Sequence, residues 1–86
     1  MRIILIYDVG EKRVGKVLKI CREYLTWIQN SVFEGDITDS DYFELISRIK
    51  QTIDLDSDSV VVYHLWTTKY KREVIGVEKA NLDNII

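Results

Sequence analysis

The stretch Arg2-Ile3-Ile4-Leu5-Ile6-Tyr7-Asp8 decides the fold of this chain. Side chains of a β-strand alternate between the two faces of a sheet, so Leu5 faces one way and Ile4 and Ile6 face the other. Both faces are apolar until Asp8, and a strand of this kind is covered on both sides. The apolar run is too short to span a membrane and lacks a cleavage site, so we predict a strand in a cytoplasmic protein.

Six further elements are predicted outward from this first strand. Apolar residues at helical spacing from Val14 to Leu25 predict a helix, and Thr38 is a capping residue at the start of another. The run 59–66 is rich in β-branched and aromatic residues and is the strongest strand prediction. The predicted elements are a helix at 11–25, two strands within 26–37 that break near Asn30 or Ser31 and bend at Gly35, a helix at 38–53, and strands at 59–66 and 72–77.

This order predicts an α+β fold, the ferredoxin-like βαββαβ arrangement with an added C-terminal strand. Residues 1–77 form its one domain, and residues 78–86 form a tail. Both helices of this fold cover the same face of the sheet. The strands at 2–8 and 59–66 are too apolar to leave the other face in water, so a second copy of the sheet is the simplest cover and a homodimer is predicted. A ligand or a different protein would also cover that face.

Composition and charge are those of an ordinary globular chain. The 86 residues suit one domain, 47% of them are apolar, and the formal net charge is −2. Residues 1–30 hold six Lys/Arg against three acids, whereas residues 31–59 hold two against eight. A polyanion responds to such local fields, although two solvated helix faces of opposite sign explain the same pattern. Cys21 is the only cysteine, so no intrachain disulfide and no cysteine zinc cluster forms.

Three stretches in order resemble the CRISPR-associated Cas2 family, and together they reach to about residue 76. A Tyr-Asp pair that ends a strand is common, but the ordered set at these spacings is specific. The first stretch is Leu5-Ile6-Tyr7-Asp8-Val9 followed by Lys12-Arg13-Val14 and Lys16-Val17, the second is Tyr24-Leu25, Gln29 and Ser31-Val32-Phe33-Glu34-Gly35, and the third is Ser59-Val60 through Tyr63 followed by Arg72-Glu73-Val74-Ile75-Gly76.

The resemblance implies a ferredoxin-like homodimer that acts in CRISPR adaptation together with a separate protein, the CRISPR integrase, during spacer acquisition. It also implies a Mg²⁺-dependent endonuclease, with Mn²⁺ as the alternative ion, that acts on RNA or double-stranded DNA. Two alternatives stay open within this fold: a non-catalytic dimeric scaffold that bridges integrase and DNA, and a toxin-type ribonuclease. A regulatory module that binds a small ligand is a third reading, which no phosphate loop supports.

Asp8 is the leading candidate for the catalytic metal ligand, because it ends an apolar strand where a carboxylate stays accessible. Magnesium prefers six oxygen ligands, so one carboxylate makes a poor site. Two copies of Asp8 across a dimer axis would make a better one. Spacing alone favours a structural role, in which Asp8 accepts backbone N–H bonds in the following turn, and the resemblance favours the metal.

Other residues of the matching stretches are candidates for substrate contacts. Ser31 is a second catalytic candidate, which would bond a phosphate or a metal-bound water. The predicted nucleic-acid-binding residues are Arg13, Lys16, Arg22 and Phe33. A solvated helix face is the alternative for the basic residues, and core packing is the alternative for Phe33.

His64 and the tail complete the candidates. His64 is the only histidine and titrates near neutrality, but its apolar strand favours a satisfied core or interface histidine. Cys21 belongs to the apolar stripe of the first helix and is predicted to be inert. The resemblance implies that the tail docks on the integrase by adding a strand, with Leu82, Ile85 and Ile86 as anchors, whereas a frayed terminus is the alternative.

Overall fold

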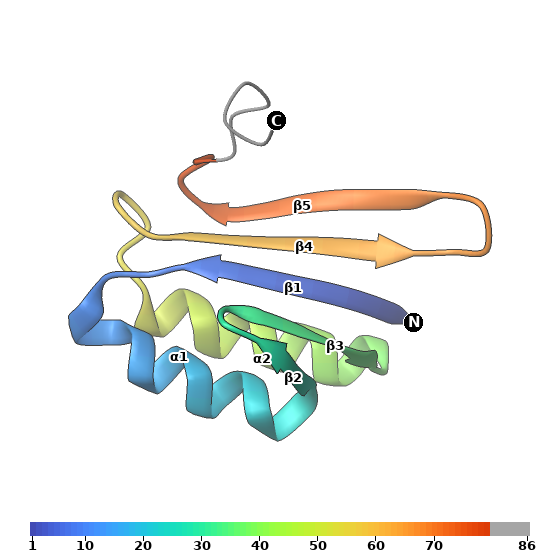
Figure 1. Cartoon of the computed structure of the whole chain (residues 1–86), viewed down its shortest axis with the longest axis horizontal. Helices are drawn as coiled ribbons and strands as arrows, with labels where there is room; N and C mark the ends of the chain where they lie inside the picture. The colour runs from blue at the N-terminus through green and yellow to red at the C-terminus, as the bar shows by residue number, and fades with distance from the viewer. Residues whose placement is uncertain (80–86) are drawn as a thin grey trace.

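The computed structural model describes residues 1–79 and contains the seven predicted elements in the predicted order (Figure 1). Thr38 caps the second helix as predicted, because its Oγ1 accepts a hydrogen bond of 3.1 Å from the backbone N–H of Asp41. Asn30, at a φ of 45°, turns the chain at the predicted strand break. The elements are β1 (Arg2–Asp8), α1 (Glu11–Tyr24), β2 (Thr26–Gln29), β3 (Val32–Asp36), α2 (Asp39–Thr52), β4 (Ser59–Leu65) and β5 (Tyr70–Gly76).

β1 is the central strand of a five-stranded antiparallel sheet with the order β2-β3-β1-β4-β5. Leu5 of β1 lies between Phe33 of β3 and Val62 of β4. Asp8, the last residue of β1, lies opposite Ser59, the first residue of β4. β5 pairs with β4 along its whole length and is the edge strand farthest from the helices (Figure 1). The ferredoxin-like fold with an added C-terminal strand is confirmed.

The hydrophobic core lies between one face of this sheet and the two helices, which run side by side (Figure 1). Alternate residues of β1 supply the sheet side of the core, and the apolar stripe of each helix supplies the other side. Both helices therefore cover the same face, as the split βαβ order predicts. The fully buried members are Ile3, Leu5, Val17, Cys21, Phe33, Leu45, Ile49, Val60 and Val62.

The opposite face of the sheet, which we call the open face, carries apolar side chains that no part of residues 1–79 covers. Ile6 of β1 is 38% exposed. Its neighbours Ile4 of β1, Val61 of β4 and Val74 of β5 are only half-buried. β1 and β4 are apolar on both faces, and the side chains on their open face are left unpacked. This pattern predicts a partner that covers the open face.

Two local predictions differ from the structure. The ladder between β1 and β3 continues through Gly35, which pairs with Ile3, so the predicted bend there is wrong; Leu25 packs across this glycine. β5 begins at Tyr70 rather than at residue 72, because the hairpin closes early through a hydrogen bond of 2.8 Å from Trp66 N–H to the Lys69 carbonyl. Within the described part of the chain, no helix is long and apolar enough to cross a membrane.

Candidate functional site

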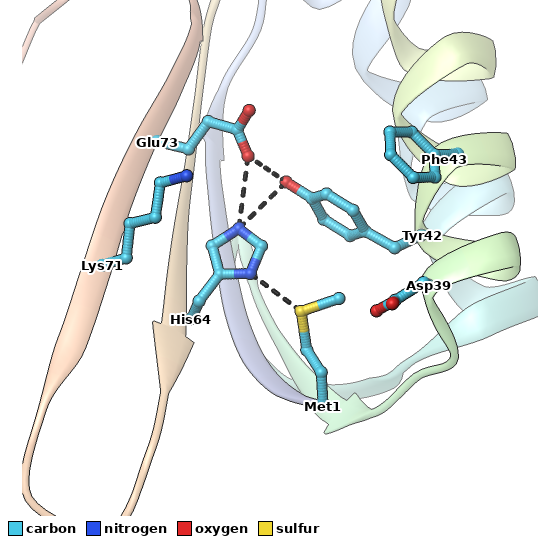
Figure 2. Close-up of a pocket in the computed structure, with 7 residues that line it drawn as sticks. All are labelled: Met1, Asp39, Tyr42, Phe43, His64, Lys71 and Glu73. Carbon is cyan, nitrogen blue, oxygen red and sulfur yellow. Dashed lines mark hydrogen bonds and ion pairs between the residues drawn. The ribbon is translucent and has the colours of Figure 1, made fainter.

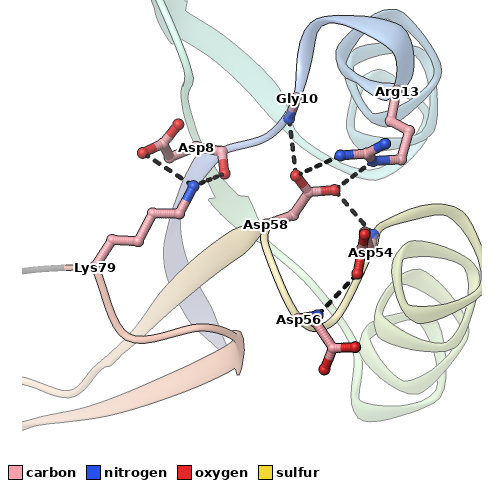
Figure 3. Close-up of polar contacts among 7 residues, drawn as sticks. All are labelled: Asp8, Gly10, Arg13, Asp54, Asp56, Asp58 and Lys79. Carbon is pink, nitrogen blue, oxygen red and sulfur yellow. Dashed lines mark hydrogen bonds and ion pairs between the residues drawn. The ribbon is translucent and has the colours of Figure 1, made fainter.

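Asp8 is presented at the end of β1, where the central strand leaves the sheet. Its side chain alternates onto the open face, together with Ile4 and Ile6, and is 73% exposed. The ammonium group of Lys79 approaches it from beyond β5: Nζ lies 3.5 Å from Asp8 Oδ2 and 3.5 Å from its backbone oxygen (Figure 3). The carboxylate is accessible, and a cation of the same chain already lies beside it.

The loop after Asp8 is held by a second carboxylate, that of Asp58, from the loop before β4. Asp58 Oδ1 accepts hydrogen bonds from Gly10 N–H at 2.9 Å and from the Arg13 guanidinium at 3.0 Å. Asp58 Oδ2 accepts from Arg13 Nε at 2.6 Å and from Asp54 N–H at 2.9 Å (Figure 3). The side chain is 2% exposed, so all of its bonding capacity is used inside the protein.

This arrangement fixes the charge state of Asp58. The hydrogen bonds from Arg13 hold the pKa of the Asp58 carboxyl well below its usual range, and the N–H groups of Asp54 and Gly10 lower it further. Burial alone would raise this pKa, and the hydrogen bonds outweigh that effect. The hydrogen bond to Asp58 likewise raises the pKa of Arg13. Arg13 was predicted as a phosphate contact; the structure places its guanidinium in a bidentate ion pair, with 33% of the side chain exposed.

The other predicted basic contacts lie on the solvent side of α1. Lys16 is exposed one turn beyond Arg13, and Arg22 is exposed in the last turn of the helix. Arg22 follows Arg13 by nine positions, which is about 13 Å along the helix axis. The structure therefore brings Arg13 to the Asp8 loop, keeps Lys16 near it, and places Arg22 toward the other end of α1.

Ser31 and Phe33 lie near the end of β1 but on its helix side. The carbonyl of Ser31 accepts a hydrogen bond of 3.1 Å from Tyr7 N–H. Burial raises the pKa of Tyr7, and a hydrogen bond with the Ser31 side chain opposes that rise. Phe33 is 0% exposed and stacks on Tyr7 with ring centroids 6.1 Å apart, so core packing accounts for its position. Asp8 points to the other face, away from this pair.

One chain supplies only part of the ligand set that a magnesium ion needs. Among residues 1–79, no group of three or more His, Cys, Asp or Glu side chains is arranged to hold a metal. Asp8 offers one exposed carboxylate, whereas Mg²⁺ prefers octahedral oxygen coordination. The residues of a single chain therefore fit the ion poorly, and a second Asp8 would be needed to improve the fit.

A separate cavity of about 360 Å³ lies at the opposite end of the sheet, between α2 and the β4–β5 hairpin (Figure 2). His64 lines it and is 7% exposed. Its Nε2 lies 3.2 Å from both the Tyr42 hydroxyl and Glu73 Oε1, and its Nδ1 lies 2.9 Å from the sulfur of Met1. Every buried polar side-chain atom in the described chain has a partner, so His64 is the satisfied core histidine that its strand predicts.

Two residues near Asp8 were missed by the sequence reasoning. Asp58 lies in the connection between the predicted helix at 38–53 and the predicted strand at 59–66, and it directly precedes Ser59, which pairs with Asp8 at the end of β1. Lys79 was read as tail. The predicted anchors of the tail, Leu82, Ile85 and Ile86, lie outside the residues that the structure describes.

Comparison with known proteins gives a consistent set of relatives. A family model described as CRISPR associated protein Cas2 matches residues 1–73. Proteins named CRISPR-associated endoribonuclease Cas2 are 48% identical in Thermococcus kodakarensis and 44% identical in Dictyoglomus turgidum, each over the full length of both chains. The relative of that name in Thermotoga maritima is 46% identical over 92% of each chain.

Solved structures agree with this result. A crystal structure of Cas2 superposes with a TM-score of 0.74 at 36% identity, covering 95% of this chain and 93% of the other. The crystal structure of Streptococcus pyogenes Cas2 at pH 6.5 superposes with a TM-score of 0.71 at 34% identity, covering 79% of this chain and 89% of the other. Sequence and fold thus point to the same relatives.

Proposed function

The chain belongs to the CRISPR-associated protein Cas2 family, and from this premise we propose that it is an endonuclease of CRISPR adaptation. RNA is the first substrate to test, because the relatives carry the name endoribonuclease. Double-stranded DNA is the second. The observation that carries the proposal is Asp8, an exposed carboxylate at the end of the central strand, with the basic face of α1 beginning a few residues later.

The proposed cleavage centre needs two copies of the chain. The open face carries exposed Ile6 two residues before Asp8, so a second sheet packed against it would bury Ile6. The same packing would bring two Asp8 carboxylates toward one site. Mg²⁺, or Mn²⁺ in its place, would supply charge neutralisation at the scissile phosphate and an activated water when bound.

The basic side chains of α1 are proposed to position the nucleic acid. Lys16 and Arg22 are exposed, and the accessible third of Arg13 is next to the Asp8 loop. Contacts of this kind bind phosphate oxygens and carry no base specificity. Ser31 stays a candidate for contacting the substrate if the substrate reaches the helix side of β1. Phe33 has no exposed surface, so we leave it out of the proposed interface.

The test is cleavage of labelled RNA and duplex DNA with Mg²⁺, Mn²⁺ or a chelator. Asp8→Asn keeps the shape of the side chain and removes its charge, and it should abolish metal-dependent cleavage. Asp36→Asn is the matched control, since Asp36 is an exposed carboxylate at the end of β3 that pairs only with Arg2 among the described residues. Full cleavage by purified Asp8→Asn would refute the assignment.

A non-catalytic scaffold is the second candidate, favoured by the single carboxylate and by the position of Lys79 against it. In that function the dimer would hold the CRISPR integrase and bridge DNA during spacer acquisition. Capture of the integrase and of new spacers would then survive Asp8→Asn and be lost on deletion of residues 77–86. A toxin-type ribonuclease would instead be encoded away from CRISPR repeats, so the neighbouring genes separate it from the other two.

A further inference from the structure

We propose that Asp58 is the positioning residue of the Asp8 centre: it fixes the loop that follows Asp8 and thereby the direction in which the Asp8 carboxylate is presented. This inference rests on the proposed function, because it assigns a role at the same centre. It concerns a side chain that touches neither substrate nor ion, and it follows from the connections of three segments that meet at Asp58.

The first connection is to the start of α1. Gly10 is the N-cap of that helix, and the helix has no side-chain cap hydrogen bond. Asp58 provides a carboxylate from another part of the chain, accepting the Gly10 N–H at 2.9 Å and the Arg13 guanidinium through two bonds. A negative group at a helix N-terminus is also favoured by the helix dipole. Only Val9 separates Asp8 from this anchored point.

The second connection is within the loop that carries Asp58. Asp54 N–H donates to Asp58 Oδ2 at 2.9 Å, and Asp58 N–H donates to the Asp54 carbonyl at 2.7 Å. The side chain and backbone of Asp58 are therefore both tied to the end of α2. The carboxylate that holds the Asp8 loop is itself held in one geometry by buried, charge-assisted hydrogen bonds.

The third connection is to the segment after β5. The Asp58 carbonyl accepts a hydrogen bond of 2.8 Å from Val77 N–H. Gly76 makes this close approach at a φ of +90°, in a backbone region that favours glycine. Two residues after Val77, Lys79 reaches Asp8. Asp58 thus fixes both the loop that follows Asp8 and the segment that brings Lys79 to Asp8 (Figure 3).

If Asp58 had a purely structural role, its replacement would change the stability of the fold without a specific effect on the Asp8 centre. Matched variants separate this structural role from the proposed positioning role. Asp58→Asn keeps the size of the side chain but cannot accept both Arg13 bonds and the Gly10 bond. Arg13→Lys keeps the positive charge and removes the bidentate geometry. Glu23→Gln is the control: Glu23 makes a similar two-bond ion pair, of 2.9 and 2.8 Å, with Arg48 on the solvent side of the two helices.

The first readout needs no activity. In the wild-type chain, backbone amide order measured by NMR relaxation and the protection of the Gly10 amide from hydrogen exchange should match those of β1. Asp58→Asn should lower the order of Val9 and Gly10 and speed exchange of the Gly10 amide at least about tenfold. Arg13→Lys should give a smaller change in the same direction, and Glu23→Gln should give none.

The second readout is the kinetics of the metal-loaded protein. A displaced catalytic group lowers kcat by up to about 100-fold, so Asp58→Asn should lower kcat while KM stays within about twofold of the wild-type value. Unchanged order of Val9 and Gly10 in Asp58→Asn overturns the inference, and so does a loosened loop with unchanged kcat. Asp8→Asn decides the proposed function separately. If the wild-type chain cleaves nothing, that function fails, and the amide order still decides whether Asp58 positions the loop.

Discussion

Replacing Gly76 with alanine places one methyl group where β5 passes the loop before β4. An alanine Cβ at this position would lie 2.2 Å from the carbonyl oxygen of Asp58 and 3.1 Å from its carbonyl carbon. Both are backbone atoms, so no flexible side chain can move aside. The methyl group must retreat by more than about 1 Å to reach the ordinary contact distance of about 3.5 Å.

The cost has two identifiable parts. A non-glycine residue in the left-handed region costs about 1–2 kcal/mol, and Gly76 sits at a φ of +90°. Relief of the clash separates the strands and breaks the 2.8 Å bond from Val77 N–H to Asp58, which costs about 0.5–1.5 kcal/mol. We therefore expect Gly76→Ala to destabilise the fold by about 2–4 kcal/mol once residual crowding is included.

Urea unfolding at one fixed protein concentration measures this change, and Gly15→Ala is the control within the same chain. Gly15 is an exposed position in the middle of α1, and nothing lies within 4 Å of where its Cβ would be. The same chemical change should there stabilise the fold by about 0.5–1 kcal/mol, because glycine is a poor helix former. A Gly76→Ala protein within about 0.5 kcal/mol of wild type would refute the reasoning about this contact.

Four further predictions concern other parts of the molecule. The pKa of Asp58 is lowered in the folded chain, so the unfolded chain binds a proton at this carboxyl more readily. The stability of the wild type should therefore fall as the pH drops below about 4. Urea unfolding of Asp58→Asn should show a smaller loss of stability over the same pH range. Ile6→Asp should leave a folded monomer, which sedimentation of the wild type and variant would show, and an unchanged oligomer would rule out the open face as the interface. Lys79→Met should tighten Mn²⁺ binding by removing the cation beside Asp8, with calorimetry as the measurement and unchanged affinity as the contrary result. Burial raises the pKa of Cys21 to about 12, so the folded chain should resist alkylation by iodoacetamide at pH 8 until urea exposes the thiol, as mass spectrometry would record.

The fold was largely predictable because its deciding signals are local. Each strand and helix shows its own period, and the lengths of the connections leave few topologies. His64 illustrates the point: it sits mid-strand among apolar residues, which predicts a buried histidine with partners, and the structure provides Tyr42 and Glu73. The open face was predictable for the same reason, since Ile4 and Ile6 alternate with core residues along β1.

The candidate site was only half predictable because its connections are not local. Asp8 is visible in the sequence as a polar end to an apolar strand. Asp58 belongs to an acid-rich loop in which Asp54 and Asp56 are exposed, and only its place directly before β4 distinguishes the buried acid from these two in the sequence. Its ion-pair partner is Arg13, 45 residues earlier in the chain. A pairing of that separation is decided by tertiary packing, which places the Arg13 guanidinium in an ion pair and leaves a third of its side chain exposed.

The hydrogen bond that anchors Gly10 to Asp58 also has a consequence for the order of events during synthesis. The loop after Asp8 leaves the ribosome early, but the carboxylate that anchors Gly10 comes 48 residues later, and Val77, which locks against it, comes later still. Contacts between distant segments form late because closing a long loop costs entropy. A nascent or truncated chain therefore carries Asp8 next to an unanchored loop. An unfinished copy therefore lacks the fixed loop that the proposed cleavage centre would need, and a finished copy would still need a second chain to complete that centre.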